Sequence, residues 1–391
     1  MPFSVNAAVQ GVETPPATEA ATWIKPEPLR NRALLDLSQA VPSYPPAEAL
    51  QEEIARAARE PETSLYTDIL GIAPLRAAHA QHMARDYAGK IAAENVGITA
   101  GCNQAYCASL LALAQAGDNI ILPVPYYFNH HMWLGMLGIE PRFVPGLTPK
   151  APWPDVDMVA AAIDARTRAI MLCSPNNPTG SVYPPEVIGS FYDLARDRGI
   201  ALIIDETYKD FRSTPEPLHD LFARKGWEDT FIQLYSFSKV FAITGYRVGS
   251  IIAGTPLLAE AEKVLDCVAI SAPHISQRAA LFGLHNLDAW KQEKRAVMQA
   301  RIEAVLTAFK QPGLDYRLVS AGAFFAYVKH PFAGQTAKDV ARRLAGKHDL
   351  LCLPGSMFGP DQEDYIRIAF ANAEASAMPT VVERLIESQN S

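Results

Sequence analysis

The chain has 391 residues, a length that fits one large domain and one smaller domain better than a single compact domain. Hydrophobic residues make up 49% and charged residues 20%, which is the composition of a globular protein with a sizeable core. The net charge of −7 excludes a general electrostatic attraction to nucleic acid or to an anionic membrane, so an anionic ligand must be held by local groups.

Five cysteines are scattered along the chain without a CxxC pair or a His/Cys spacing typical of a metal site. We therefore expect reduced thiols, a cytoplasmic location and no metal. The N-terminus has no basic segment followed by an apolar run, so we expect no signal peptide. No uncharged apolar stretch reaches about 18 residues, the length that crosses a bilayer.

The first part of the chain shows little regular pattern. Residues 1–28 are rich in Ala, Pro, Thr and Glu without a clear period, which indicates a flexible N-terminal arm. A short apolar piece, Leu34–Leu37, then runs into a proline-rich extended segment. We expect residues 29–46 to join the small domain. Helical spacing follows over Ala47–Ala58 and Pro74–Tyr87.

From residue 96 the pattern changes to short apolar runs separated by helices. Seven runs without polar alternation predict strands buried on both faces, namely Val96–Thr99, Asn119–Leu122, Arg142–Val144, Ala169–Cys173, Ala201–Ile204, Phe231–Tyr235 and Ser250–Ala253. Helical stretches between them include Gln104–Gln115, Asp155–Ala165 and Pro185–Arg198. Strands joined through helices predict an α/β fold, in which helices cover a mostly parallel seven-stranded sheet. We assign this large domain to residues 47–285.

The C-terminal part mixes helices with a second set of strands. After about residue 285 a long helical stretch, Asp288–Phe309, leads to further apolar runs. These runs are Phe324–Val328, Leu350–Leu353 and Tyr365–Ala369, and a closing helix is predicted over Ala375–Ser388. We therefore expect residues 286–391 to form a smaller α+β domain.

Polar or glycine-rich segments follow four of the predicted strands. They are Ala100–Asn103, Ser174–Gly180, Asp205–Tyr208 and Ser236–Lys239. Each segment alone is more typical of a turn, a helix cap or a surface group. In a doubly wound sheet, however, ligands bind at the carboxyl ends of the strands, so we expect the four segments to meet at one site.

The residue types at these strand ends suit an imine-forming lysine and a cofactor that carries a phosphate. A lysine is costly as a cation at a buried strand end, so the pKa of Lys239 should fall and favour a nucleophilic amine. Asp205 needs a positive partner, which the protonated nitrogen of a pyridinium ring would supply. Gly101 precedes a helix N-terminus that can bind phosphate, where Arg247 and Ser236 can add contacts.

Three segments resemble the characteristic segments of fold-type I aminotransferases that depend on pyridoxal phosphate (PLP), in the class I/II group of aspartate and aromatic aminotransferases. They are Ser174–Gly180 (SPNNPTG), Asp205–Tyr208 (DETY) and Ser236–Gly249 (SFSKVFAITGYRVG). The resemblance runs from about residue 34 to the C-terminus. It implies the PLP-dependent transferase fold of type I, PLP as cofactor, and transfer of an amino group between an L-amino acid and a 2-keto acid.

The resemblance also implies a role for each matching residue. Lys239 is implied to hold PLP as an aldimine and then to move the proton at the substrate Cα. Asp205 is implied to pair with the pyridine nitrogen. The other implied cofactor contacts are Tyr208 and Asn177 at the phenolic oxygen, Tyr127 on the ring face, and Ser236, Arg247 and the backbone of Gly101, Cys102 and Asn103 at the phosphate.

Two further matches concern the substrate and the oligomer. Arg367 is implied to bind the substrate α-carboxylate, and we expect Asn177 to contact the substrate too. Ala40 stands where relatives commonly have glycine, and its methyl group is expected beside the substrate. Tyr66 matches a tyrosine that reaches the phosphate of the neighbouring subunit, which implies a homodimer with active sites shared across the interface.

Substrate and reaction type stay open at this point. Asn103 is neutral where some relatives that take acidic substrates have a basic residue, and Arg278 is predicted inside a helix, so a neutral or polar amino donor is favoured. His130, His131 and His274 are expected to be surface or packing residues. The alternative function is a PLP-dependent lyase or cyclase, such as a C–S lyase or an enzyme similar to aminocyclopropane-carboxylate synthase.

Two functions that involve no catalysis, a transcription regulator and a degenerate partner subunit, fit the sequence less well. A PLP-sensing transcription regulator needs a basic helix-turn-helix module ahead of the fold, and the short N-terminal arm has no basic cluster. A degenerate partner subunit would lack the lysine or the aspartate, and both Lys239 and Asp205 are present.

Overall fold

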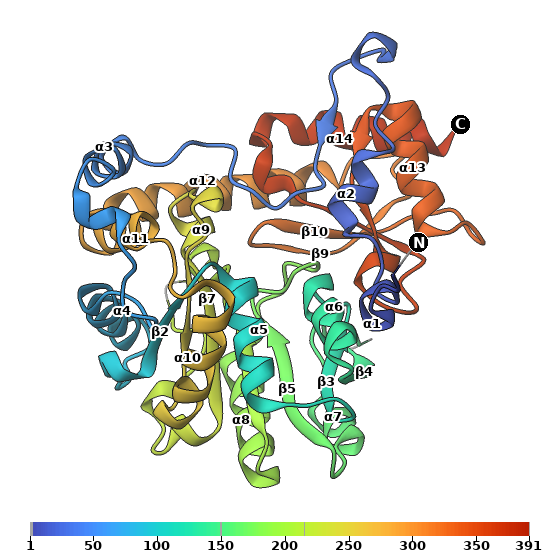
Figure 1. Cartoon of the computed structure of the whole chain (residues 1–391). Coiled ribbons are helices and arrows are strands. Elements are labelled where there is room, and N and C mark those ends of the chain that lie inside the picture. Colours follow the sequence, from blue (N-terminus) through green and yellow to red (C-terminus); the bar gives the residue numbers. More distant parts are fainter. Residues whose placement is uncertain (1–2, 149–150, 215, 391) are drawn as a thin grey trace.

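Two sheets organise the chain, whose computed structural model describes residues 3–148, 151–214 and 216–390. A seven-stranded sheet lies in the larger part of the molecule, and a four-stranded sheet lies in the smaller, C-terminal part (Figure 1). None of the described helices is both long enough and apolar enough to cross a lipid bilayer.

The seven-stranded sheet has the strand order β2-β8-β7-β6-β5-β3-β4. Its strands are β2 (Val96–Thr99), β3 (Asn119–Val124), β4 (Glu140–Pro145), β5 (Thr167–Cys173), β6 (Ala201–Asp205), β7 (Phe231–Ser236) and β8 (Gly249–Ile252). Strands β7, β6, β5, β3 and β4 pair in parallel, whereas β8 is antiparallel to both of its neighbours. The predicted mostly parallel sheet of seven strands is confirmed, with strand ends within a few residues of those expected.

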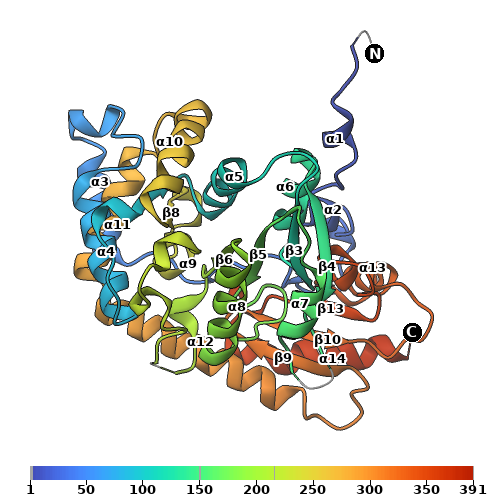
Figure 2. The same cartoon turned by 90° about the horizontal axis from the view of Figure 1, so that it is seen from below.

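Both faces of this sheet are buried under helices, which explains why its strands lack polar alternation. On β6, Leu202 and Ile204 pack into one apolar cluster with α4 (Ala73–Asp86) and α8 (Pro185–Arg198). Ile203 points to the other face and packs with α5 (Cys102–Leu113) and α10 (Thr255–Ala269). Figure 2 shows α5 and α10 on one side of the sheet and α8 on the opposite side. The side chains of alternate residues in a strand therefore pack into two separate apolar cores, one on each face of the sheet.

The remaining helices of this part surround the sheet or connect its strands. They are α3 (Glu48–Ala57), α6 (Phe128–Leu137), α7 (Val156–Ala162), α9 (Phe237–Val240) and α11 (His274–Asn286). The sequence pattern predicts α3, α4, α5, α7 and α8, and the helix expected around Arg278 is α11, but the pattern does not indicate α6 or α10. Helix α6 carries two adjacent histidines among its apolar residues, so its polar and apolar positions follow no helical period.

The smaller part is an α+β layer built on the antiparallel sheet β12-β13-β10-β9. Its elements are β9 (Arg317–Gly322), β10 (Phe325–Lys329), β12 (Leu353–Pro354), β13 (Tyr365–Ile368), α12 (Asp288–Ala308), α13 (Ala337–His348) and α14 (Met378–Gln389). A separate two-stranded pair joins β1 (Leu35–Asp36) in parallel to β11 (Leu350–Leu351). The N-terminal segment is therefore hydrogen-bonded to the C-terminal part of the chain.

The N-terminal arm forms two short helices, α1 (Ala7–Gln10) and α2 (Pro16–Ala21), where the sequence indicates no regular element. Helix α1 packs against α6 (Figure 1), and α2 packs against β12. The Ala20 side chain is fully buried in an apolar cluster with Leu353. Helices of four and six residues are too short to show a period, so tertiary contacts decide their structure.

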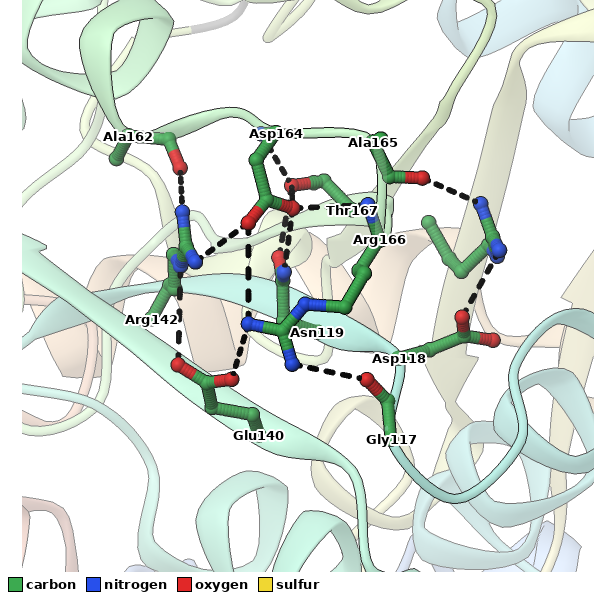
Figure 3. Close-up of polar contacts among 11 residues, drawn as sticks. Gly117, Asp118, Asn119, Glu140, Arg142, Ala162, Asp164, Ala165, Arg166 and Thr167 are labelled. Atoms are coloured by element: carbon green, nitrogen blue, oxygen red, sulfur yellow. Dashed lines mark hydrogen bonds and ion pairs between the residues drawn. The ribbon is translucent and has the colours of Figure 1, made fainter.

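A polar cluster ties together the amino ends of β3, β4 and β5 (Figure 3). Asp164, just before β5, accepts a hydrogen bond from Asn119 Nδ2 at 2.8 Å and pairs with Arg142 Nη2 at 2.6 Å. The hydrogen bonds from Asn119 and from the backbone of Arg166 lower the pKa of Asp164 to about 2. Arg166 also pairs with Glu140 at 2.9 Å. Through Asn119 and Arg142, the Asp164 carboxylate therefore connects the start of β5 to β3 and β4.

Candidate active site

A cavity of about 260 Å³ opens at the carboxyl ends of β5, β6 and β7. Segments far apart in the sequence line it, including the N-terminal segment, the start of α5 and strand β13. The predicted site residues that line this cavity are Ala40, Cys102, Asn103, Tyr127, Asn177, Asp205, Tyr208, Ser236, Lys239, Arg247 and Arg367. The strand-end geometry therefore brings together residues that were singled out from separate motifs.

Lys239 lies on the short helix α9, directly after β7 ends. Ser236 caps this helix by accepting a hydrogen bond from the backbone N–H of Ser238 at 3.2 Å. The Lys239 Nζ donates to the carbonyl oxygen of Ala40 at 2.7 Å. Burial, followed by the charges of Arg247 and Arg367, lowers the pKa of Lys239 to about 8. An appreciable fraction of this amine is therefore neutral and nucleophilic near neutral pH.

Asp205 ends β6, and its carboxylate is buried in the cavity wall. Burial alone would raise the pKa of Asp205, but hydrogen bonds from His130 and Thr207 outweigh it and lower this pKa. The His130 Nε2 lies 3.2 Å from Asp205 Oδ2, and the Thr207 backbone N–H donates to Oδ1 at 3.0 Å. Asp205 therefore stays ionised and can hold a positive charge in the cavity.

The position of His130 corrects the sequence interpretation, which treats it as a surface or packing residue. Its ring is buried on the first turn of α6, between Tyr106 and Tyr127, and it makes a polar contact with Asp205. The sequence gives one signal that could have been used. His130 follows the aromatic residue Tyr127 by three positions, so both side chains lie on one face of the helix start.

The start of α5 and the Arg247 guanidinium form a site for an anion. Gly101 caps α5 with φ +87°, and a Cβ at this position would lie 2.2 Å from Arg247 Nη2. Only glycine therefore lets the guanidinium lie against the helix start. The first backbone N–H groups of a helix, here those of Cys102 and Asn103, have no partner within the helix and carry its positive dipole. Ser238 Oγ is buried and without a hydrogen-bond partner among the described residues.

Arg367 lies on β13, and its guanidinium is buried between the rings of Phe325 and Phe358, 5.1 Å and 5.0 Å from their centres. Nη1 donates to Asn177 Oδ1 at 3.1 Å, and Nη2 donates to the Ser38 carbonyl oxygen. Burial lowers the pKa of Arg367 to about 10, so it stays charged at neutral pH. Its Nε has no partner among the described residues and can donate to a carboxylate.

Two tyrosines complete the cavity wall. Tyr127 precedes α6, and its hydroxyl accepts a hydrogen bond from Asn129 Nδ2 at 3.0 Å. Tyr208 is buried and packs against Phe324, with the ring centres 5.2 Å apart. Burial raises the pKa of both phenols, so both keep their protons and remain hydrogen-bond donors.

Two predicted site residues do not line this cavity, namely Gly101, which caps the lining start of α5, and Tyr66, which lies away from the cavity. Tyr66 follows the 3₁₀ turn Pro61–Ser64, and 75% of the residue is exposed to solvent. Lining residues that the sequence analysis did not single out are Ala17, Ser38, Gln39, Val41, Phe128, Cys173, Thr207, Ser238 and Leu353. Thr207 and Ser238 belong to motifs already recognised, but Ala17, Phe128 and Leu353 carry no local signal.

These groups match the three functional parts of PLP. A neutral lysine amine can bind the cofactor aldehyde, and an ionised buried carboxylate can pair with a ring nitrogen that carries a proton. The cradle of Gly101, Arg247 and the unpartnered Ser238 hydroxyl suits a phosphate. The residues present therefore fit the expected cofactor.

Comparison with known proteins gives a consistent result. A family model described as "Aminotransferase class I and II" matches residues 32–385. An aromatic aminotransferase of Arabidopsis thaliana is 27% identical over 360 residues, 90% of this chain and 88% of that protein. An aspartate aminotransferase of Pyrococcus horikoshii is 28% identical over 360 residues, 91% of this chain and 89% of that protein. The solved structure of an aspartate aminotransferase from Thermotoga maritima superposes with a TM-score of 0.90 at 25% identity, covering 99% of this chain and 100% of that one.

Proposed function

The chain belongs to the class I and II aminotransferases, a family that uses PLP, and from this premise we propose how its own residues carry out the reaction. The enzyme transfers an amino group between an L-amino acid and a 2-keto acid. When bound, PLP supplies an electron sink that stabilises negative charge at the substrate Cα. The protein must then bind the two ligands, keep the ring nitrogen protonated and move one proton at Cα.

Lys239 is the catalytic residue of this proposal. With PLP bound, its amine would hold the cofactor aldehyde, and the freed amine would take the proton from the substrate Cα. Both tasks need a neutral amine, and a pKa of about 8 supports them at ordinary pH. The Ala40 carbonyl oxygen, 2.7 Å from Nζ, holds the amine on the side of the cavity where the N-terminal segment passes.

The other residues of the site would bind and orient the cofactor and the substrate. With PLP bound, Asp205, supported by His130, would hold the protonated ring nitrogen, and Tyr127 and Tyr208 would face the ring and the phenolic oxygen. Arg247, Ser236 and the backbone of Gly101, Cys102 and Asn103 bind the phosphate. Arg367 and Asn177 bind the substrate α-carboxylate, for which the planar guanidinium fork is suited.

One observation carries this proposal, namely a single cavity that contains a lysine of lowered pKa together with a buried arginine that has a free Nε. A lysine poised for imine formation and a carboxylate-binding arginine are the two groups that an amino acid substrate requires. The arrangement also explains why Asp205 has to be buried, since an exposed carboxylate would hold a cation weakly.

A half-reaction tests the proposal. The holoenzyme is mixed with single amino acids in the absence of a keto acid, and its absorbance is followed. An aminotransferase loses its yellow absorbance band and releases one keto acid per site. A lyase or cyclase, the alternative reaction class, keeps the yellow band while its product accumulates beyond one per site. Loss of the band with no amino acid at all would contradict both.

We also propose a cytoplasmic homodimer with shared active sites. Support for a subunit interface comes from exposed apolar side chains next to the loop of Tyr66. Leu65 is 66% exposed and Val268 is 59% exposed, and such groups favour burial against a second chain. A hydrogen bond from the Thr67 backbone to Ser271 joins the two segments that carry them. The five cysteines, all free thiols in the described chain, are consistent with a reducing compartment.

The same proposal includes a division of the chain. Residues 47–285 form the large PLP-binding domain and residues 286–391 form the small domain. Residues 29–46 join the small domain, and residues 1–28 are an N-terminal arm that docks through α1 and α2. Support comes from the apolar clusters, since the core of the four-stranded sheet is separate from the two cores of the large sheet.

A further inference from the structure

One wall of the cavity is apolar and comes from three distant segments. Ala17 of α2, Phe128 at the start of α6 and Leu353 of β12 all line the cavity. Phe128 and Leu353 also belong to one apolar cluster, which includes Ala20 from the buried face of α2. The arm helix, the start of α6 and the small sheet therefore meet at a single continuous surface.

The charged groups that line the cavity are already committed to other partners. The cationic lining residues among the described ones are Lys239, Arg247 and Arg367, and they serve the imine, the phosphate and the α-carboxylate. Arg278 lies on α11 and pairs with Glu60 at 2.8 Å and with Glu53 at 3.5 Å, so it does not supply a further cation. A second carboxylate on the substrate would therefore find no uncommitted cation among the described lining residues of this chain, and an unpaired carboxylate in an apolar wall is costly.

We propose that the wall of Ala17, Phe128 and Leu353 is the substrate side-chain subsite, and that it takes an uncharged, largely apolar side chain. The chemical class is a monocarboxylic amino acid with an aliphatic, thioether or aromatic side chain, rather than a dicarboxylic one. This inference rests on the proposed function, because it uses Arg367 for the α-carboxylate. Asn103 and Gln39 add only neutral amides to the lining, so no described group opposes an apolar occupant through charge.

The arm is held firmly enough to act as a wall. Glu19 of α2 pairs with Lys338 at 3.0 Å and lies 3.5 Å from Arg342, both on α13. The Arg342 guanidinium also lies 5.4 Å from the ring centre of Trp23, and Ala20 is fully buried. These contacts fix the face of α2 that carries Ala17 toward the cavity. The Ala17 methyl group is small, which leaves room beside it for a large substrate side chain.

The first test compares substrates and inert ligands with the wild-type holoenzyme. In the half-reaction, phenylalanine, leucine and methionine should react at least about 100-fold more efficiently than aspartate or glutamate, because an unpaired buried carboxylate is strongly disfavoured. The inert acid 3-phenylpropionate should bind more tightly than glutarate, as measured by the absorbance change of the bound cofactor. Equal or better reaction and binding of the dicarboxylic compounds would overturn the inference while leaving the aminotransferase function intact.

The second test asks whether α2 forms the wall. Ala17→Phe fills the space next to the substrate, and Ala21→Phe, at an exposed position at the end of the same helix that does not line the cavity, is the matched control. Ala17→Phe should slow the half-reaction with phenylalanine at least about tenfold more than the half-reaction with alanine, since a steric wall discriminates by side-chain size. It should also weaken 3-phenylpropionate binding by a similar factor, with Ala21→Phe close to wild type.

The outcomes of the second test separate the two proposals. If Ala17→Phe slows the half-reactions with alanine and phenylalanine equally, or gives the same rates and ligand binding as Ala21→Phe, then α2 is not part of the subsite. If no amino acid bleaches the yellow band of the wild-type enzyme, the proposed function itself has failed. The thermal unfolding midpoint and the cofactor absorbance of each variant show that it is folded and loaded.

Discussion

Lys239 shows how the site sets reactivity at the scale of one residue. Its lowered pKa has two sources, burial and two neighbouring guanidinium groups, and both persist when the cofactor is removed. The free amine is the form that attacks the cofactor aldehyde. The pH dependence of cofactor capture therefore reports this single group.

We predict that the apoenzyme captures PLP faster as pH rises, and that the rate levels off above a pH of about 8. The sign follows from the charge, since the amine is protonated below its pKa and neutral above it. The measurement is the rate at which the absorbance band of the bound cofactor appears at each pH. Lys239→Ala should form no such band and should turn over at least about 10²–10⁴-fold more slowly, the usual contribution of a general base. A rate that is independent of pH, or a band in Lys239→Ala, would contradict this account.

A second residue-scale prediction concerns the phosphate cradle. Gly101→Ala should raise the dissociation constant of PLP at least about tenfold, because its methyl group displaces Arg247 from the helix start. Gly117→Ala is the matched control, since Gly117 also has a positive φ, +90°, but has open space around it. Both variants share a backbone cost of about 1–3 kcal/mol. Titration of each apoenzyme with PLP separates strain from displacement, and equal affinities of the two variants would refute the steric argument.

The sequence predicts much of the site at this scale, for a physical reason. Residues such as Asp205, Asn177 and Lys239 lie directly after buried strands, so their meeting point follows from the direction of the strands. His130 and Ala17 lie on helices whose placement depends on packing between distant segments. No local pattern encodes such contacts, and an alanine has no chemistry that would single it out.

At the scale of elements, the strands were the most predictable feature. Each strand of the large sheet is covered on both faces, so its apolar run is continuous and stands out from the helices around it. Elements stabilised mainly by tertiary contacts were missed, among them α1, α2 and α6. The edge strand β9 was missed too, because its six residues, RLVSAG, are a short and partly polar run without a clear apolar alternation.

The polar cluster at the amino ends of β3, β4 and β5 gives a prediction about elements. The pKa of Asp164 is depressed in the folded state, so the stability that its carboxylate contributes is present above its unfolded pKa and is lost as pH falls toward about 2. Asp164→Asn should lower the thermal unfolding midpoint at neutral pH, and its difference from wild type should narrow as pH falls below about 4.

The matched control for this prediction is Asp197→Asn. Asp197 is an exposed carboxylate that pairs with its chain neighbour Arg196 at 3.1 Å and connects no strands. The Asp197→Asn substitution should change the thermal unfolding midpoint little at any pH, because surface ion pairs usually contribute little to stability. A midpoint for Asp164→Asn that stays equal to wild type at neutral pH would show that the cluster does not hold the strand ends.

At the scale of the whole molecule, the exposed position of Tyr66 leads to a prediction about subunits. If Tyr66 serves the partner's site, a mixed dimer of Tyr66→Ala and Lys239→Ala chains contains one site with both defects and one with neither. Mixing the two impaired proteins under conditions that exchange subunits should therefore restore activity, up to half of the wild-type value per mixed dimer.

The control for subunit mixing uses Leu29→Ala in place of Tyr66→Ala, since Leu29 is 65% exposed and has no proposed role in the site. That mixture should show no gain above the average of its components. If Tyr66 instead acts in its own subunit, the mixture with Tyr66→Ala gives no gain either. A monomer in sedimentation analysis at assay concentration would exclude the shared site altogether.

The docking of α2 against β12 also bears on how such an enzyme changes over generations. Ala17 precedes residue 32, where the match to the family model begins, whereas the residues proposed for proton transfer and cofactor binding all follow it. One of the three segments proposed to contact the substrate side chain is therefore encoded apart from the residues of the chemistry, whereas Phe128 and Leu353 are not. Recombination that exchanges only the codons before residue 32 would change the α2 wall while leaving the cofactor and proton-transfer residues unchanged. A library of exchanged arms on one unchanged catalytic body is accordingly a direct route to altered selectivity.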